Sequence, residues 1–266
     1  MITAEVINSD CRTYLSDCWA SFDFIFADPP FNIGEEYDGY EDKMSDLAYA
    51  RFTEDWIDLC WRKLKSGCAM MIHGSPKVNQ FFYQAFAQLN LFDYIETEII
   101  WAYNFGQCNF NNWIQSHCRA TVLRKPGERK WFVENVLVES KRLRMGDKRV
   151  ESSRYKGMVP SGTVWGLATN DDQLVIEPTE PQERWGRVQG NNAERRKAHP
   201  NQLPERYLIR AIGAYTQPGD LVFDPFGGSG TTSTVAYSLS RHSITTDISA
   251  ANCESIKERI QIGIKL

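Results

Sequence analysis

The sequence predicts an α/β protein in which a mainly parallel, twisted sheet carries helices on both faces. Short apolar runs of strand length alternate along the chain with stretches of helical apolar spacing. A glycine-rich loop also joins an expected strand to an expected helix. The 266 residues are 42% hydrophobic and 24% charged, a composition typical of a globular protein that folds around its own core.

The first half of the chain carries most of the expected strands. Runs of aromatic and β-branched residues predict strands at Val6–Asn8, Phe22–Ala27, Cys68–His73, Tyr94–Tyr103 and Arg119–Leu123. Apolar residues at close to helical spacing predict helices over Ser45–Leu64 and Val78–Leu89.

The second half begins with a polar, basic segment, from residue 126 to about 190, that lacks clear periodicity. Regular elements then return, and we expect a helix at Pro204–Thr216, a strand at Leu221–Phe223, a helix at Thr231–Leu239, a strand at His242–Thr246 and a closing helix from Ala250. The alternation favours a parallel sheet.

A glycine loop runs from Asp224 to Thr232 with the sequence Asp-Pro-Phe-Gly-Gly-Ser-Gly-Thr-Thr. Glycines let a ligand approach the backbone, and the start of the following helix offers unpaired N–H groups. The loop lacks the lysine of a P-loop and the third glycine of the dinucleotide fingerprint. Asp247 ends the next expected strand, where a carboxylate can accept hydrogen bonds from ribose hydroxyls. Together these features predict a cofactor that carries a nucleoside.

The tetrapeptide Asp28-Pro29-Pro30-Phe31 follows the expected strand Phe22–Ala27. Two prolines fix the backbone and remove two N–H donors, so a carboxylate and a free carbonyl remain. An amino group on a planar base has two N–H donors, which Asp28 and the Pro29 carbonyl can accept, while Phe31 can stack on the base. The tetrapeptide therefore predicts a site for an exocyclic amine.

Charge is spread unevenly along the chain, although the net charge is only −4. Acidic residues dominate the first 60 positions, whereas basic residues dominate from 119 to 156. A local basic surface of this kind favours a polyanion as partner. The candidate residues for contact with a polyanion are Arg142, Arg144, Lys148, Arg149, Arg195, Arg196 and Lys197.

Taken together, the chain resembles the β subgroup of the amino-group DNA methyltransferases. Three elements carry the resemblance beside Asp28-Pro29-Pro30-Phe31: Asn8-Ser9-Asp10-Cys11, His199-Pro200-Asn201-Gln202-Leu203-Pro204, and the glycine loop followed by Asp247. Ser9 and Leu203 depart from the family's Gly and Lys. Trp101, His117 and Val164-Trp165 also resemble family elements, although Cys118 replaces a Glu. The catalytic motif precedes the cofactor loop, which is the circularly permuted order of that subgroup.

The resemblance implies a Rossmann-like methyltransferase fold with a small irregular target-recognition insert. Residues 1–125 and 190–266 would form the catalytic and cofactor-binding domain, and 126–189 the insert. The implied catalytic residues are Asp28, Pro29, Pro30 and Phe31. The implied cofactor-binding residues are Asp10, Cys11, Asp28, His199, Gln202, Asp224, Pro225, Phe226, Gly228, Ser229, Gly230, Thr231 and Asp247.

The implied reaction is transfer of a methyl group from S-adenosylmethionine to adenine N6 in duplex DNA, which leaves S-adenosylhomocysteine. The base must be flipped out of the duplex, and no metal is expected. Asp at the start of the motif favours adenine, because Ser commonly opens the cytosine N4 version in the family. Cytosine N4 and an RNA adenine are the alternatives. Other rivals are a protein-glutamine methyltransferase, a non-catalytic nucleic-acid-binding module and a nicotinamide dehydrogenase.

The expected partner is duplex DNA. We also expect a homodimer and a partner restriction endonuclease, although the residue pattern itself shows neither. No apolar run is long enough to cross a membrane, and no signal-peptide pattern occurs at the N-terminus. We therefore expect no membrane association and a cytoplasmic protein of prokaryotic or phage type, associated with the nucleoid.

Overall fold

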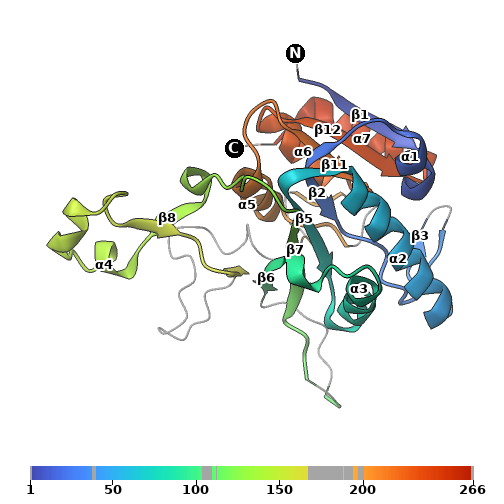
Figure 1. Cartoon of the computed structure of the whole chain (residues 1–266), viewed down its shortest axis with the longest axis horizontal. Helices are drawn as coiled ribbons and strands as arrows, with labels where there is room; N and C mark the ends of the chain where they lie inside the picture. The colour runs from blue at the N-terminus through green and yellow to red at the C-terminus, as the bar shows by residue number, and fades with distance from the viewer. Residues whose placement is uncertain are drawn as a thin grey trace.

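An eight-stranded sheet forms the centre of the molecule in the computed structural model (Figure 1). The structure describes residues 2–37, 40–103, 110–111, 113–166, 188, 194–196 and 201–264. The strand order is β1-β12-β11-β2-β5-β7-β6-β10. The strands are β1 (Ala4–Asn8), β2 (Phe22–Ala27), β5 (Leu64–Gly74), β6 (Ile95–Ala102), β7 (His117–Arg124), β10 (Val164–Gly166), β11 (Leu221–Asp224) and β12 (His242–Asp247).

The sheet is mainly parallel, which confirms the fold class expected from the sequence. Strands β1, β12, β11, β2 and β5 run in one direction, and β10 pairs parallel to β6. Only β7 runs against its two neighbours, β5 and β6. The carboxyl ends of β1, β12, β11, β2, β5 and β6 therefore meet at one edge of the sheet.

Two hydrophobic cores cover the two faces of the sheet. Alternation along β2 directs Ile25 and Ala27 into one core and Phe24 and Phe26 into the other. Helices α1 (Cys11–Asp17), α2 (Asp46–Lys63) and α3 (Pro76–Gln88) pack into the first core. Helices α5 (Glu205–Tyr215) and α6 (Thr231–Ser238) pack into the second. Helix α7 (Ala250–Ile262) packs against β1 and α6.

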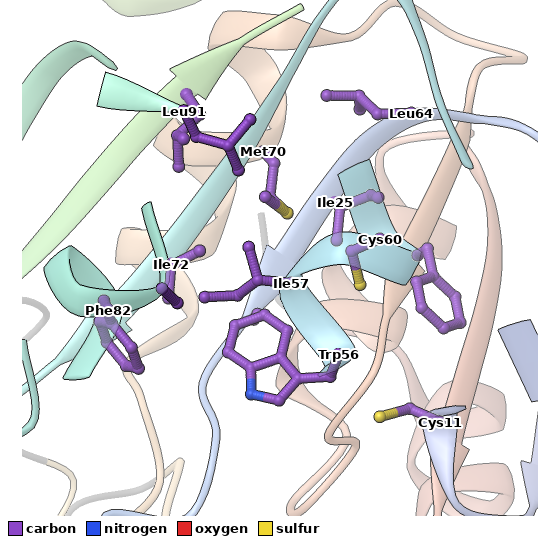
Figure 2. Packing of buried hydrophobic residues seen from close by; sticks show 14 of the residues in the cluster. Cys11, Ile25, Trp56, Ile57, Cys60, Leu64, Met70, Ile72, Phe82 and Leu91 are labelled. Atoms are coloured by element: carbon purple, nitrogen blue, oxygen red, sulfur yellow. The ribbon is translucent and has the colours of Figure 1, made fainter. Parts of the chain in front are cut away.

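Figure 2 shows how α2 closes the first core. Its residues Trp56, Ile57 and Cys60 face Ile25 of β2 and Met70 of β5, and all five side chains are fully buried. Trp56 also makes an edge-to-face contact with Phe226 of the glycine loop, at a centroid distance of 5.3 Å. Packing of the core is thereby connected directly to the loop that follows β11.

Every strand and helix named from the sequence is present, with ends that shift by a few residues. Helix α1 was not expected, because its seven residues are too few to show a helical period. Asp10 caps it by accepting a hydrogen bond from the Arg12 N–H. No helix in the described part of the chain is long and apolar enough to cross a membrane.

Residues 137–160, which we call the arm, project from the body of the molecule on the left of Figure 1. Strands β8 (Leu137–Glu139) and β9 (Met158–Pro160) pair antiparallel. The connection between them holds α4 (Lys141–Arg144) and the 3-10 helix Lys148–Ser152. The arm lies within the insert expected at 126–189, of which residues 167–187 and 189 lie outside the described residues.

The base of the arm is fixed to helix α5. The 3-10 helix Val133–Val136 lies against α5, where the Asn135 side-chain amide donates to the Gly213 carbonyl at 2.9 Å. A Cβ on Gly213 would lie 3.3 Å from the Asn135 Cβ, so glycine permits this close approach. The final strand of this region, β10, joins the central sheet beside β6.

Asp23 connects three parts of the fold at the amino edge of the sheet. Its side chain is buried and accepts hydrogen bonds from Lys65 Nζ at 2.7 Å, Lys130 Nζ at 2.8 Å and the Leu221 N–H at 3.0 Å. Burial opposes ionisation, but these hydrogen bonds outweigh it and lower the pKa of Asp23 below its ordinary value. The ionised form thus belongs to the folded state.

We predict that Asp23→Asn lowers the free energy of unfolding by about 1–3 kcal/mol at pH 7, the scale of losing a charged partner in a buried hydrogen-bond set. Because the folded pKa is depressed, this stabilisation is present above the unfolded pKa of about 4 and is lost as pH falls through the folded value. Urea unfolding of both proteins from pH 8 to pH 3 measures it. A difference that stays constant over that range would contradict the assignment.

Candidate active site

A cavity of about 1350 Å³ lies at the edge where the carboxyl ends of the strands meet. Residues that follow β1, β2, β11 and β12 line it, as expected for an open α/β sheet. Most of the residues expected from the sequence lie in its wall, namely Asp10, Cys11, Asp28, Pro29, Pro30, Phe31, Gln202, Asp224, Pro225, Phe226, Gly228, Ser229, Thr231 and Asp247. The fold thus brings together motifs that are more than 200 residues apart in the chain.

The backbone of the Asp-Pro-Pro-Phe segment is held from below by α2. The buried Tyr49 hydroxyl donates to the Pro30 carbonyl at 2.6 Å. No hydrogen bond within the described chain uses the Pro29 carbonyl or the Asp28 carboxylate. Both groups therefore remain available as acceptors at the cavity wall, which is the pair of acceptors expected from the sequence.

A second carboxylate shapes the loop that follows Phe31. Asp42 is buried and accepts hydrogen bonds from the backbone N–H groups of residues 32–35, at 2.8 to 3.2 Å. Asn32, at a left-handed φ of 54°, exchanges two hydrogen bonds with the backbone of Met44. These hydrogen bonds fix the backbone of residues 32–35. The loop that follows Phe31 is therefore held by contacts within residues 32–44. Asp42 was not predicted as a site residue, because it is one of many acids in its region of the sequence.

The surroundings of Asp28 disfavour its ionised form. Burial raises its pKa well above the ordinary value, and the nearby Asp224 carboxylate raises it further. Burial also raises the pKa of Asp224 to about 6, although hydrogen bonds from Thr232 and the Phe226 N–H oppose this. A carboxylate with a raised pKa is a stronger hydrogen-bond and proton acceptor, and such groups gather at functional sites.

Aromatic rings form the wall beyond Phe31. Phe31 and His73 lie nearly parallel, with centroids 6.4 Å apart, and His73 Nδ1 lies 3.1 Å from the Tyr207 hydroxyl. Trp101 packs against both His73 and Tyr207. Burial lowers the pKa of His73 to about 3, so its imidazole is neutral. Phe31, His73 and Trp101 belong to the cavity wall, whereas Tyr207 of α5 is fully buried and packs against His73 and Trp101. A wall of aromatic rings suits a planar heterocycle.

Trp101 was expected from the family resemblance, whereas His73 and Tyr207 were missed. His73 ends a buried strand and could have been found on that ground, because side chains at the carboxyl ends of parallel strands face the binding edge. Tyr207 carries no such mark in the sequence. It is one of several apolar positions of a helix, and only the packing of α5 against the sheet places it there.

The three glycines of the loop have different surroundings. A Cβ on Gly227 would lie 2.5 Å from Thr245 Cγ2, and one on Gly230 would lie 2.9 Å from Ile256 Cγ1. Gly228 has a left-handed φ of 49°, and a Cβ there would meet only the Phe226 carbonyl, at 3.8 Å. Gly227 and Gly230 therefore permit tight packing within the protein, while Gly228 leaves its open side to the cavity.

Gly230, which was expected to bind the cofactor, is not among the residues that line the cavity, and its N–H donates to the Gly227 carbonyl at 2.8 Å. Its left-handed φ of 74° starts α6, so glycine is needed there for the shape of the loop.

Asp247 and Asp10 lie at the far end of the cavity. Asp247 accepts hydrogen bonds from the Gly228 N–H at 2.8 Å and the Ser249 N–H at 2.8 Å. Asp10 accepts from the backbone and the guanidinium of Arg12. Burial raises the pKa of Asp10, but these hydrogen bonds outweigh it, so the pKa falls below its ordinary value. Arg12, which also lines the cavity, was not identified from the sequence.

Arg259 of α7 supports the glycine loop from behind. Its guanidinium is almost fully buried, donates to the Ser229 carbonyl at 2.9 Å and to Thr231 Oγ1 at 2.8 Å, and pairs with Glu205 at 3.0 Å. A buried charge needs such partners. Arg259 therefore connects the loop to both α7 and α5.

The expected DNA-binding residues do not all lie in one region. Arg142, Lys148 and Arg149 are exposed on the arm, where Arg149 pairs with Asp147. Arg144 ends α4 of the same arm. Arg195 is exposed and Arg196 is half-buried beside Gln202, whose amide oxygen accepts from the Arg196 N–H. Lys197 and His199 lie outside the described residues.

Comparison with known proteins identifies the family of the chain. A family model described as "DNA methylase" (N6_N4_Mtase) matches residues 22–258. The chain is 30% identical over 241 residues to the Type II methyltransferase M.HpaI of Haemophilus parainfluenzae, covering 90% of this chain and 68% of that protein. It is 28% identical over 259 residues to the DNA adenine methyltransferase YhdJ of Escherichia coli K12, covering 95% and 80%.

A third relative is longer than this chain. The Type II methyltransferase M.BamHI of Bacillus amyloliquefaciens is 32% identical over 261 residues, which cover 94% of this chain but 57% of that protein.

Solved structures show the same fold at low identity. The M1.HpyAVI–SAM complex superposes with a TM-score of 0.61 at 17% identity, covering 97% of this chain and 99% of that one. The cytosine-N4-specific PvuII DNA methyltransferase superposes with a TM-score of 0.63 at 16% identity, covering 97% and 86%.

We predict that Asp28→Asn raises the melting temperature at pH 8. Because burial and Asp224 raise the folded pKa of Asp28, its ionised form destabilises the fold at a pH above that value, and the cost disappears as pH falls toward the unfolded pKa. Removing about 1 kcal/mol corresponds to roughly 2–4 °C for a chain of this size. Differential scanning fluorimetry at pH 8 and pH 5 checks this. A lower melting temperature at pH 8 would show that the carboxylate stabilises the protein.

Proposed function

This chain belongs to the DNA methylase family, and we propose that it transfers a methyl group from S-adenosylmethionine to the N6 amino group of adenine in duplex DNA. The observation that carries the proposal is the position of Asp28. It follows the central strand β2, accepts no hydrogen bond in the described chain, and faces a cavity that it shares with the glycine loop after β11.

The residues present fit the methyl donor. Gly228 has an open side toward the cavity, so a ligand can approach its backbone where a side chain would intrude. Asp247 and Asp10 provide carboxylates for the ribose and the adenine of the donor, and Phe226 and Pro225 provide apolar surface. S-Adenosylmethionine, when bound, supplies an activated methyl group to the target amine. Gln202 lines the same cavity and belongs to the proposed set.

Asp28 and the Pro29 carbonyl would hold the target amine by its two N–H groups. Hydrogen bonds to both acceptors favour the tetrahedral geometry in which the nitrogen lone pair is free to react. The raised pKa of Asp28 strengthens its bond to an N–H, because a more basic carboxylate is a better acceptor. Tyr49 and Asp42 keep these acceptors in place.

The choice of adenine rests on two supports. The motif opens with Asp28 instead of Ser, and the relative YhdJ is named a DNA adenine methyltransferase. The PvuII enzyme has a similar fold and is specific for cytosine N4, so the fold itself does not choose the base. Cytosine N4 and RNA adenine are the outcomes that a test must separate.

The arm and the rest of residues 126–189 are our proposed target-recognition insert. The arm projects from the body of the molecule (Figure 1), and its exposed basic residues suit contacts with phosphates. A homodimer, a cytoplasmic location and pairing with a restriction endonuclease belong to the same proposal, the last because two relatives are named Type II methyltransferases.

We predict that Asp28→Ala lowers methyl transfer by at least roughly 10²-fold, the scale of removing one preorganised transition-state interaction. Binding of S-adenosylmethionine should persist, since the glycine loop is unchanged. Labelled methyl donor, offered with duplex DNA or with RNA, measures the activity, and base-resolved sequencing of the product identifies the methylated base. Near-normal turnover of the variant would exclude the assigned role of Asp28, and methylation of cytosine or RNA would exclude the proposed substrate.

We predict that Gly228→Leu abolishes binding of S-adenosylmethionine in calorimetry, because the new side chain would project into the open side of the loop. Gly219→Leu is the matched control. Gly219 also has a left-handed φ, of 89°, with nothing within 4 Å of an added Cβ, but it lies in the turn before β11 at the opposite edge of the sheet. Equal loss of affinity in both variants would attribute the effect to backbone strain alone.

We predict that changing Arg142, Lys148 and Arg149 to Gln weakens binding to duplex DNA. The slope of log affinity against log salt should fall by about 0.9 for each phosphate that the variant no longer neutralises. Arg62→Gln is the control, because Arg62 is exposed near the end of α2 at the amino edge of the sheet. Titrations at several salt concentrations decide the matter. An unchanged slope in the triple variant would remove the arm from the DNA interface.

A further inference from the structure

Two aromatic side chains stand almost fully exposed at the mouth of the active-site cavity. Phe110 is 97% exposed and Trp113 is 95% exposed, and both belong to the residues that line the cavity. We call these two residues the rim aromatics. Large apolar side chains left in water at a binding cleft indicate a surface that another molecule covers.

The rim aromatics lie between β6 and β7, on the segment that leads into β7. Strand β6 ends at the same sheet edge as β5, since Ala102 pairs with His117 where β7 begins and Gly74 of β5 pairs with Arg119. Figure 1 shows the green segment before β7 extending beyond the body of the molecule at the bottom of the view. The rim aromatics thus project from the edge that carries Asp28.

The proposed reaction on duplex DNA creates a need that such residues can meet. A base that leaves the duplex loses its stacking on both sides and leaves a gap beside its former partner. Aromatic and apolar side chains stack on exposed bases and wedge between base steps, which offsets that cost.

We propose that Phe110 and Trp113 stack on bases of the opened duplex and stabilise the state in which the target base lies in the cavity. The inference rests on the proposed function, because it takes duplex DNA as the occupant of this surface. The rim aromatics line the same cavity as Asp28, which favours DNA over an unrelated partner as the molecule that covers them. The exposed Lys77 at the start of α3 lines the same cavity and offers a charge to a phosphate.

Trp19 provides a matched control. It is 100% exposed, but it follows α1 and precedes β2, which places it at the amino edge of the sheet, away from the cavity. We therefore expect Trp19→Ala to behave like the wild type, since it removes an exposed tryptophan that has no role in base extrusion. Phe110→Ala and Trp113→Ala should leave the fold and the affinity for S-adenosylmethionine unchanged, because neither side chain is buried.

The experiment compares two duplexes that carry the motif identified by base-resolved sequencing. In one duplex the target adenine is paired with thymine, and in the other it faces an abasic site, so that extrusion is easier and no orphaned base remains. We expect each rim variant to lose roughly 5- to 150-fold in single-turnover methylation of the paired duplex, which is the effect of removing one base–aromatic stack. On the abasic duplex most of the loss should disappear.

A second readout follows the base itself. With 2-aminopurine at the target position, the wild type and Trp19→Ala should raise its fluorescence on binding, and the rim variants should raise it less. Equal losses on both duplexes, or no loss on either, would overturn the proposal. The result with the wild-type protein distinguishes this outcome from a failure of the proposed function. A wild type that leaves the paired adenine unmethylated would refute the proposed function instead.

Discussion

The structure depends on the crowding of four acids at one edge of a parallel sheet. Each of these acids lies at the carboxyl end of a different strand, and the four strands, β1, β12, β11 and β2, are neighbours in the sheet. The acids are Asp10, Asp28, Asp224 and Asp247. The protein compensates three of these charges with its own groups: Arg12 at Asp10, backbone N–H groups at Asp247, and Thr232 with the Phe226 N–H at Asp224. Asp28 alone receives no such partner among the described residues, so it is the acid best prepared to bind hydrogen-bond donors from outside.

The surrounding fold keeps this unsatisfied carboxylate in position. Tyr49 holds the proline backbone, Asp42 collects the N–H groups of the following loop, and Arg259 fixes the glycine loop from the opposite side. All three are buried and lie outside the chemistry itself. They illustrate how a protein places rigid support around a site whose own groups remain unpaired.

Two surfaces, the arm and the rim aromatics, have different roles in the proposed binding of DNA. The arm projects from the body of the molecule and carries exposed basic side chains, while two exposed aromatic residues line the cavity. Basic residues give affinity that depends on salt, whereas aromatic rings interact with bases and depend little on charge. Because different residues form the two surfaces, binding to the DNA backbone and stacking on a base can be altered independently by mutation.

The sequence by itself determined the fold class and the long strands and helices outside residues 126–190, because each of these has a local apolar pattern. It also marked the Asp-Pro-Pro-Phe segment, the glycine loop and Asp247 by local motif and spacing, whereas Asp10 came from the family resemblance. Tertiary structure decided which of them face the cavity. It directed Gly230 toward Ile256 and left Gly228 open, although the two glycines look alike in the sequence. It also placed His73 in the cavity wall and the buried Tyr207 against it, although the apolar patterns of their strand and helix predicted only burial. These assignments depend on how α5 and α7 pack against the sheet, and contacts between residues far apart in the chain leave no periodic trace in the sequence.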